Sequence, residues 1–163
     1  DFGALQCTPA QPGCTDCPLA SRCLALAAGT VAERPVKQTK TKVRDRWFNY
    51  LHVTCGDRTL LRRRGEGDIW QGLYEFPMIE TDRAADFSEL TASEEFRTVL
   101  GGVEWRLLRS VAMPKHQLSH QTLHAVFHRI EIFSPVDFPS VPTATLGDYA
   151  VPRLIDRYLD RQP

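Results

Sequence analysis

Four cysteines gathered within 17 residues constrain the fold of this chain more than any other feature of its sequence. Thiolates bind soft metals, and four of them suit either a tetrahedral zinc ion or a cubane iron–sulfur cluster. Zinc sites more often pair two C-x2-C motifs, whereas this segment has one such spacing and two longer ones, which favours iron–sulfur. The residues are Cys7, Cys14, Cys17 and Cys23, in the spacing C-x6-C-x2-C-x5-C.

Two other roles are open to these cysteines, namely disulfide bonds and inert buried thiols. Disulfides require an oxidising compartment, and no secretion signal is visible in this sequence, although a longer parent chain could have carried one. Inert thiols rarely gather four to one loop, so metal or cluster binding is the stronger hypothesis. The fifth cysteine, Cys55, lies in a predicted strand among apolar residues and is expected to belong to the core.

The pattern of the chain changes from helical to β after residue 43. Pro18 is expected to open a short helix that Gly29 ends, and residues 29–43 form a linker with few apolar anchors. The order of the later elements predicts an α+β fold, a mixed-sheet sandwich with helices packed on the sheet. The predicted strands cover residues 47–55, 59–64, 69–79, 104–113 and 122–133, the helices 88–100 and 152–160, and a loop 135–142.

Charge is distributed unevenly, although the formal net charge is zero. Residues 1–46 hold seven lysines and arginines against four acids, and the remainder holds 13 against 16. A nucleic-acid partner is therefore expected to meet the protein locally, at Arg22 and at the linker lysines, with a merely solvated linker as the alternative. Those lysines are Lys37, Lys40 and Lys42.

The bulk composition is that of a globular protein, with 42% hydrophobic and 25% charged residues. No apolar run reaches the roughly 18 residues that a membrane span needs, so no membrane partner is expected. The sequence begins at Asp1 without an initiator Met, and it is therefore expected to be a piece of a longer protein.

Residues 1–5 (DFGAL), followed by this cysteine spacing, resemble the end of the helix-hairpin-helix catalytic domain in endonuclease-III-like glycosylases. With its long β-rich tail, the chain resembles the adenine DNA glycosylases of the MutY family. The resemblance implies a structural 4Fe-4S cluster on the four cysteines, which helps to shape the DNA-binding surface and which a fragment can lose. It also implies a catalytic-domain end over residues 1–28, a linker over 29–43 and a Nudix-like 8-oxoguanine recognition domain over 44–163.

The chain departs from this family in its first cysteine loop. The loop over residues 8–13 lacks the family's usual basic residue, and Arg22 is the nearest substitute.

Residues 69–77 (IWQGLYEFP) resemble the family's entry into a Nudix-like domain. Nudix hydrolases follow such a strand with a helix whose clustered glutamates hold divalent metals. Here only Glu94 and Glu95 are adjacent and the order R-E-x2-E-E is missing, so we expect a Nudix-like fold without the hydrolase chemistry.

Leu118-Ser119-His120, between two predicted strands, resembles the family's Phe-Ser-His loop, which contacts 8-oxoguanine opposite the mispaired adenine. The Ser119 hydroxyl both donates and accepts hydrogen bonds. That versatility suits a base that differs from guanine at O8 and at N7, where an acceptor becomes a donor. His120 is expected to stack or to contact a phosphate, and Leu118, in place of the aromatic residue, can still wedge beside a base step.

Four histidines recur every four residues, a spacing that would line one face of a helix with metal ligands. The β-branched and aromatic residues over 123–133 favour a strand instead, which scatters these side chains, so no histidine metal site is expected. The histidines are His116, His120, His124 and His128.

The basic run over residues 62–64 is expected to protect an exposed strand edge, with phosphate contact as the alternative.

The resemblance implies a parent hydrolase that flips adenine out of an 8-oxoguanine·adenine mispair and cleaves its N-glycosidic bond. Its catalytic residues would lie upstream of Asp1, so this chain alone is expected to be inactive. The implied partners are double-stranded DNA with that mispair and the upstream catalytic domain, and the implied location is the bacterial cytoplasm, at the nucleoid. Two alternatives are a Nudix pyrophosphohydrolase with a metal-binding tail and a zinc-stabilised protein-binding module.

Overall fold

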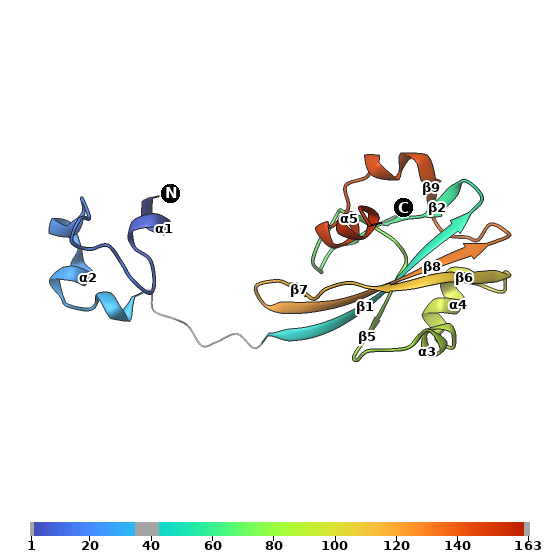
Figure 1. Cartoon of the computed structure of the whole chain (residues 1–163), viewed down its shortest axis with the longest axis horizontal. Helices are drawn as coiled ribbons and strands as arrows, with labels where there is room; N and C mark the ends of the chain where they lie inside the picture. The colour runs from blue at the N-terminus through green and yellow to red at the C-terminus, as the bar shows by residue number, and fades with distance from the viewer. Residues whose placement is uncertain (1, 35–42, 162–163) are drawn as a thin grey trace. The chain divides into compact units, whose positions relative to one another are not determined.

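A computed structural model describes residues 2–34 and 43–161 of the chain (Figure 1). The chain divides into two compact units, Asp1–Lys42 and Val43–Pro163, called here the cysteine unit and the sheet unit. None of the helices in the described ranges combines the length and the apolar character needed to cross a bilayer.

The cysteine unit consists of short helical turns joined by irregular backbone. The helix predicted from Pro18 to Gly29 is interrupted at Cys23, whose backbone is extended with φ −81° and ψ 109°. Gly29 follows the second half with a φ of +66°, a conformation that favours glycine. The elements are α1 (Phe2–Gln6), the 3-10 helix η1 (Ala20–Arg22), α2 (Leu24–Ala27) and the 3-10 helix η2 (Val31–Glu33).

A long mixed sheet organises the sheet unit, and its centre is a pair of parallel strands. β1 (Arg44–Cys55) pairs in parallel with β8 (Gln121–Ile132). The other pairings are antiparallel, with β6 and β7 on β8, β2 and β5 on β1, and β9 on β2. These strands are β2 (Arg58–Leu60), β5 (Met78–Thr81), β6 (Trp105–Ala112), β7 (His116–Gln117) and β9 (Ser140–Pro142), while β3 (Arg62–Arg63) and β4 (Tyr74–Glu75) form a small second sheet.

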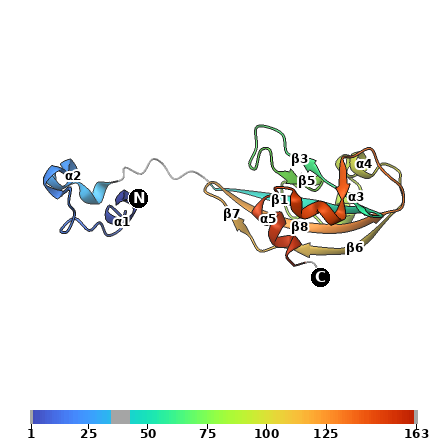
Figure 2. The same ribbon diagram turned by 90° about the horizontal axis from the view of Figure 1, so that it is seen from above.

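Helices cover both faces of the large sheet, α5 (Arg153–Leu159) on one and α3 (Phe87–Thr91) with α4 (Glu94–Leu100) on the other (Figures 1 and 2). Because side chains alternate along a strand, β1 contributes to two cores. Phe48 and Tyr50 pack in the core beneath α5, which the 3-10 helix η3 (Thr143–Asp148) also joins. Leu51 and Val53 pack in the core beneath α3 and α4. The α+β sandwich expected from the sequence is therefore confirmed.

The single helix predicted over residues 88–100 is wrong, because local capping divides it into α3 and α4. Asp86 and Glu89 form a capping box that starts α3, in which each side chain accepts a hydrogen bond from the other residue's amide. Ser93 has an extended backbone, and its hydroxyl accepts from the Phe96 amide, which starts α4 as a separate helix.

The predicted strands over residues 59–64 and 69–79 are also shorter than expected. A loop replaces their facing ends, and the Arg64 amide closes it by donating to the Leu73 carbonyl at 2.8 Å. Inside this loop Trp70 has a φ of +61°, which is uncommon for a residue with a side chain. β7 and β9 are two- and three-residue strands within predicted loops, too short for an alternating pattern to indicate them.

Candidate functional site

The segment Leu118-Ser119-His120 forms the turn of a β-hairpin made by β7 and the start of β8. This hairpin (residues 116–123) is called here the recognition hairpin, after the role expected of it from the sequence. The Leu118 amide closes the turn by donating to the Gln121 carbonyl at 2.8 Å. Ser119 and His120 are exposed, whereas Leu118 is half-buried and packs against the core beneath α5. The turn therefore presents a hydroxyl and an imidazole to solvent and keeps its apolar residue near the protein.

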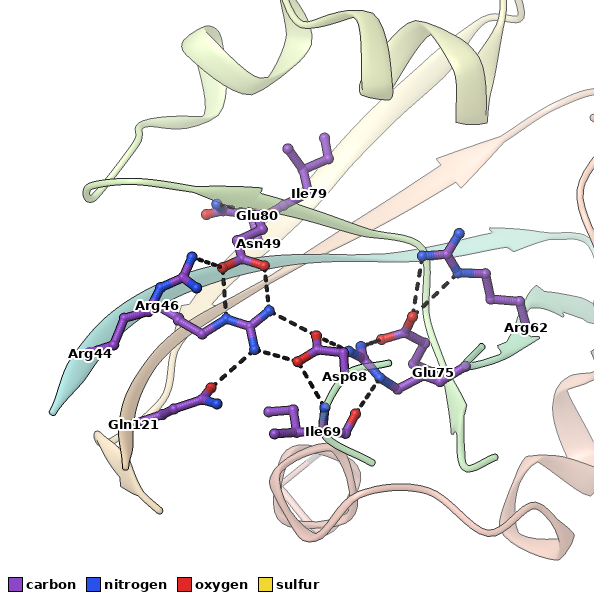
Figure 3. Close-up of polar contacts among 11 residues, drawn as sticks. Arg44, Arg46, Asn49, Arg62, Asp68, Ile69, Glu75, Ile79, Glu80 and Gln121 are labelled. Atoms are coloured by element: carbon purple, nitrogen blue, oxygen red, sulfur yellow. Dashed lines mark hydrogen bonds and ion pairs between the residues drawn. The ribbon is translucent and has the colours of Figure 1, made fainter. Parts of the chain in front are cut away.

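Arg46 fixes the base of the recognition hairpin (Figure 3). This arginine is only 7% exposed. Its guanidinium donates to both carboxylate oxygens of Asp68, at 2.7 and 2.8 Å, and to both of Glu80, at 2.7 and 2.6 Å. Its Nη1 also donates to Oε1 of Gln121 at 3.0 Å. Since Gln121 directly follows the turn, these bonds tie the hairpin to β1 and β5.

The ion pairs of this cluster shift the pKa values of Arg46 and Asp68 in the directions that favour their charged forms. The hydrogen bonds to Glu80 and Asp68 raise the pKa of Arg46 well above its usual range. The hydrogen bond from Arg46 lowers the pKa of Asp68 to about 2. Charge-assisted bidentate pairs of this kind are geometrically specific, so the cluster acts as a rigid support.

A second arginine extends the support to the loop over residues 65–73. Arg64 donates to Asp68 at 2.8 Å and forms an ion pair with Glu75, whose carboxylate is 2% exposed. Arg62 contributes a further ion pair to Glu75 at 3.2 Å. Removing one partner of such a buried group leaves an uncompensated charge. The loop is therefore held by ionic contacts on one side.

Aromatic contacts hold the same loop on the other side. The Trp70 ring lies edge-on to His116 of the recognition hairpin, with 5.9 Å between ring centroids. It also lies edge-on to Phe48 in the core, at 6.4 Å. The uncommon backbone conformation of Trp70 thus places its ring between the core and the hairpin.

The four cysteines considered as ligands line a single cavity of about 40 Å³ in the cysteine unit. All four thiols are free, and the remaining walls are mostly apolar, including Pro12, Ala20 and Leu26. The thiols share this cavity but not one coordination sphere, because within residues 2–34 and 43–161 no three His, Cys, Asp or Glu side chains are placed to hold a metal ion. The donor set, four thiols around one apolar space, fits a group held by thiolates.

Asp86 and Glu89, at the start of α3, are engaged in a helix cap and an ion pair. Glu89 pairs with Arg83 and accepts from the Asp86 amide at 3.0 Å. Glu94 and Glu95 are exposed in the first turn of α4, where acidic residues complement the helix dipole. These two glutamates also line an open cavity of about 420 Å³.

The other predicted contact residues are dispersed. Arg22 ends η1 and is exposed, while Lys37, Lys40 and Lys42 lie outside the described residues. The four histidines occupy β7, the turn and β8, so the strand interpretation of residues 123–133 is confirmed. The sequence analysis did not predict the ion pairs around Arg46. An arginine within an otherwise apolar, buried strand could have indicated them, because a buried charge requires a partner.

Comparison with known proteins settles the family. A sequence model of the NUDIX domain matches residues 49–161. The chain belongs to the NUDIX domain family. The NUDIX match runs from within β1 to just beyond α5, so the Nudix-like fold expected from residues 69–77 is confirmed. The solution structure of the E. coli ORF135 protein has a similar fold, with a TM-score of 0.52 and 14% identity over 72% of this chain and 91% of that one.

Relatives of this NUDIX chain carry the name adenine DNA glycosylase. The protein of Buchnera aphidicola from Schizaphis graminum is 25% identical over 135 residues, which cover 77% of this chain and 34% of the relative. The protein of Arabidopsis thaliana is 30% identical over 100 residues, which cover 53% and 16%. The chain thus spans about a third or less of these relatives. Its predicted resemblance to the adenine DNA glycosylases is confirmed.

Proposed function

We propose that this chain recognises 8-oxoguanine opposite a mispaired adenine, as part of a longer adenine DNA glycosylase that hydrolyses the adenine N-glycosidic bond. The name of its relatives supports the activity of the longer protein. The partner would be duplex DNA containing that mispair, bound together with the catalytic domain in the bacterial cytoplasm. The catalytic residues for base removal would lie in that other domain.

The observation that carries this proposal is the exposed turn of the recognition hairpin on a rigid support. Specificity is commonly carried by loops that a stable scaffold positions. Ser119 is exposed at the turn, while Arg46 and Trp70 hold the residues on either side of it. A hydroxyl fixed in this way can donate to O8 or accept from the protonated N7 of the lesion. The same hydroxyl could donate to N7 of guanine, so O8, which guanine lacks, is the additional partner that the lesion offers.

The cysteine unit would hold a 4Fe-4S cluster, with Cys7, Cys14, Cys17 and Cys23 as thiolate ligands. Their shared cavity and their free thiols support this assignment. The cluster would order the loop between them, and exposed Arg22 together with the linker lysines Lys37, Lys40 and Lys42 would add phosphate contacts.

Replacing the hydroxyl at the turn is expected to reduce lesion preference. Ser119→Ala removes one base-edge hydrogen bond, which is worth about 1 kcal/mol, or roughly fivefold in affinity. The ratio of the dissociation constants for 8-oxoguanine·adenine and guanine·adenine duplexes should therefore shift by about that factor. Fluorescence anisotropy with both labelled duplexes measures the ratio.

Ser134→Ala serves as the matched control, because Ser134 is also exposed but follows the opposite end of β8. It should leave the ratio unchanged. An unchanged ratio in the double variant Ser119→Ala/His120→Ala would show that the turn does not contact the lesion.

Hydrolysis of nucleoside diphosphate derivatives is the competing function that NUDIX membership raises. Glu75, Glu80 and Glu89 are already paired with arginines, which supports a role for them in structure rather than in metal binding. We expect the chain with magnesium to release neither phosphate products nor adenine. A magnesium-dependent pyrophosphatase activity that disappears in Glu94→Gln would make hydrolysis the better assignment.

A further inference from the structure

Charge in the sheet unit is distributed unevenly along the chain. Residues 105–130, which form β6, β7 and most of β8, contain four lysines and arginines, four histidines and no acid. Residues 80–95, from β5 to the start of α4, contain six acids and a single arginine. Although the sheet unit contains more acids than basic residues, residues 105–130 form a locally basic region.

The end of α5 adds positive charge to this basic region next to the recognition hairpin. Arg157 lies in the last turn of α5, Arg161 follows the end of the helix, and both are exposed. Arg161 Nη1 lies 4.0 Å from Sδ of Met113, and Lys115 follows two residues later and is exposed. Arg157 lies close enough to His116 to lower its pKa, in addition to the larger lowering by burial.

Helix α5 is also seen beside β7 in the view from above (Figure 2). Arg153, at the other end of α5, is already paired with Asp156. Cations at a helix C-terminus are favourable in any case, because they complement the helix dipole. The helix dipole explains Arg157 and Arg161 but not Lys115, which lies between β6 and β7 and extends the positive charge toward the turn.

We infer that Lys115, Arg157 and Arg161 form a phosphate-binding surface that holds the DNA backbone while the neighbouring turn contacts the lesion. This inference rests on the proposed function and adds the surface that supplies its affinity. Phosphate contacts position a protein on the duplex and carry no sequence information. The surface and the turn should therefore respond differently to mutation.

The test is a titration of the full 163-residue chain with labelled 8-oxoguanine·adenine and guanine·adenine duplexes between about 50 and 200 mM salt. Arg157→Gln should lower the slope of log affinity against log salt by about one, and Arg157→Gln/Arg161→Gln by about two. Both duplexes should lose affinity equally. Asp160→Asn, which removes the acid between the two arginines, should instead strengthen binding to both.

Arg97→Gln is the matched control, because Arg97 is an exposed arginine on α4, on the other face of the sheet. It should leave the salt slope unchanged, and thermal melts should show that all variants remain folded. If the double variant keeps the wild-type slope while Ser119→Ala still changes the duplex preference, the phosphate surface is wrong and the proposed function stands. If the slope falls but Ser119→Ala changes nothing, the surface stands and lesion recognition by the turn is wrong.

Discussion

Protein purified without oxygen is expected to be brown and to contain about four irons per chain, the complement of a cubane held by four thiolates. The physical reason is the common cavity that Cys7, Cys14, Cys17 and Cys23 line. Since each thiolate would be one of four ligands, Cys17→Ser should bleach the protein and remove most of its iron. Iron and sulfide analysis together with a visible spectrum measures both effects.

Cys55→Ser provides the control for this loss, because Cys55 lies at the end of β1 in the other unit. It should keep the colour and the iron content of the unaltered protein. Stoichiometric zinc without iron, after anaerobic purification, would contradict the assignment and favour a zinc-stabilised module.

Stability should fall steeply as the pH drops from about 7 to 5, because two histidines are buried in their neutral form. Burial lowers the pKa of His52 and of His128 to about 4, and the charges of Arg129 and Arg109 add to the effect on His52. The unfolded chain binds these protons near pH 6.5, so the stabilisation is complete above that value and is lost below it. His52 alone should cost on the order of 2 kcal/mol of unfolding free energy across this range.

Urea denaturation at several pH values measures this loss. His128→Gln should reduce the pH dependence, since His128 accounts for part of the proton uptake on unfolding. His120→Gln should leave it unchanged, because His120 is exposed at the turn. A free energy of unfolding that stays flat from pH 7 to 5 would mean that the two buried rings take up protons in the folded protein as readily as in the unfolded chain.

Strong local patterns in the sequence predicted the elements that carry the fold. The aromatic and β-branched run over residues 47–55 and the run over 122–133 became the two central strands, β1 and β8. The placement of Leu118, Ser119 and His120 between strands was also correct, because the strands around them are explicit in the pattern. What these segments share is a period of two or a clear turn, which depends only on nearby residues.

Features that depend on distant partners were not predictable in the same way. Arg46 and Gln121 are 75 positions apart, and only the parallel pairing of their strands brings the side chains together. The break in the helix at Ser93 was missed for a different reason, since a serine there is compatible with both a helix interior and a helix start. The positive φ of Trp70 could not be predicted either, because tryptophan has no preference for that backbone conformation.

The parallel pairing of β1 with β8 has a consequence for how the protein folds during its synthesis. Parallel strands cannot be joined by a tight turn, and here Arg44 finds its neighbour only at Gln121. During synthesis β1 emerges first, and the strand that completes its ladder follows after more than half of the sheet unit has been made. Contacts of such long sequence separation slow folding, because the chain loses loop entropy before the pairing compensates for it. One edge of β1 therefore stays unpaired, and open to contact with other chains, until β8 has been made.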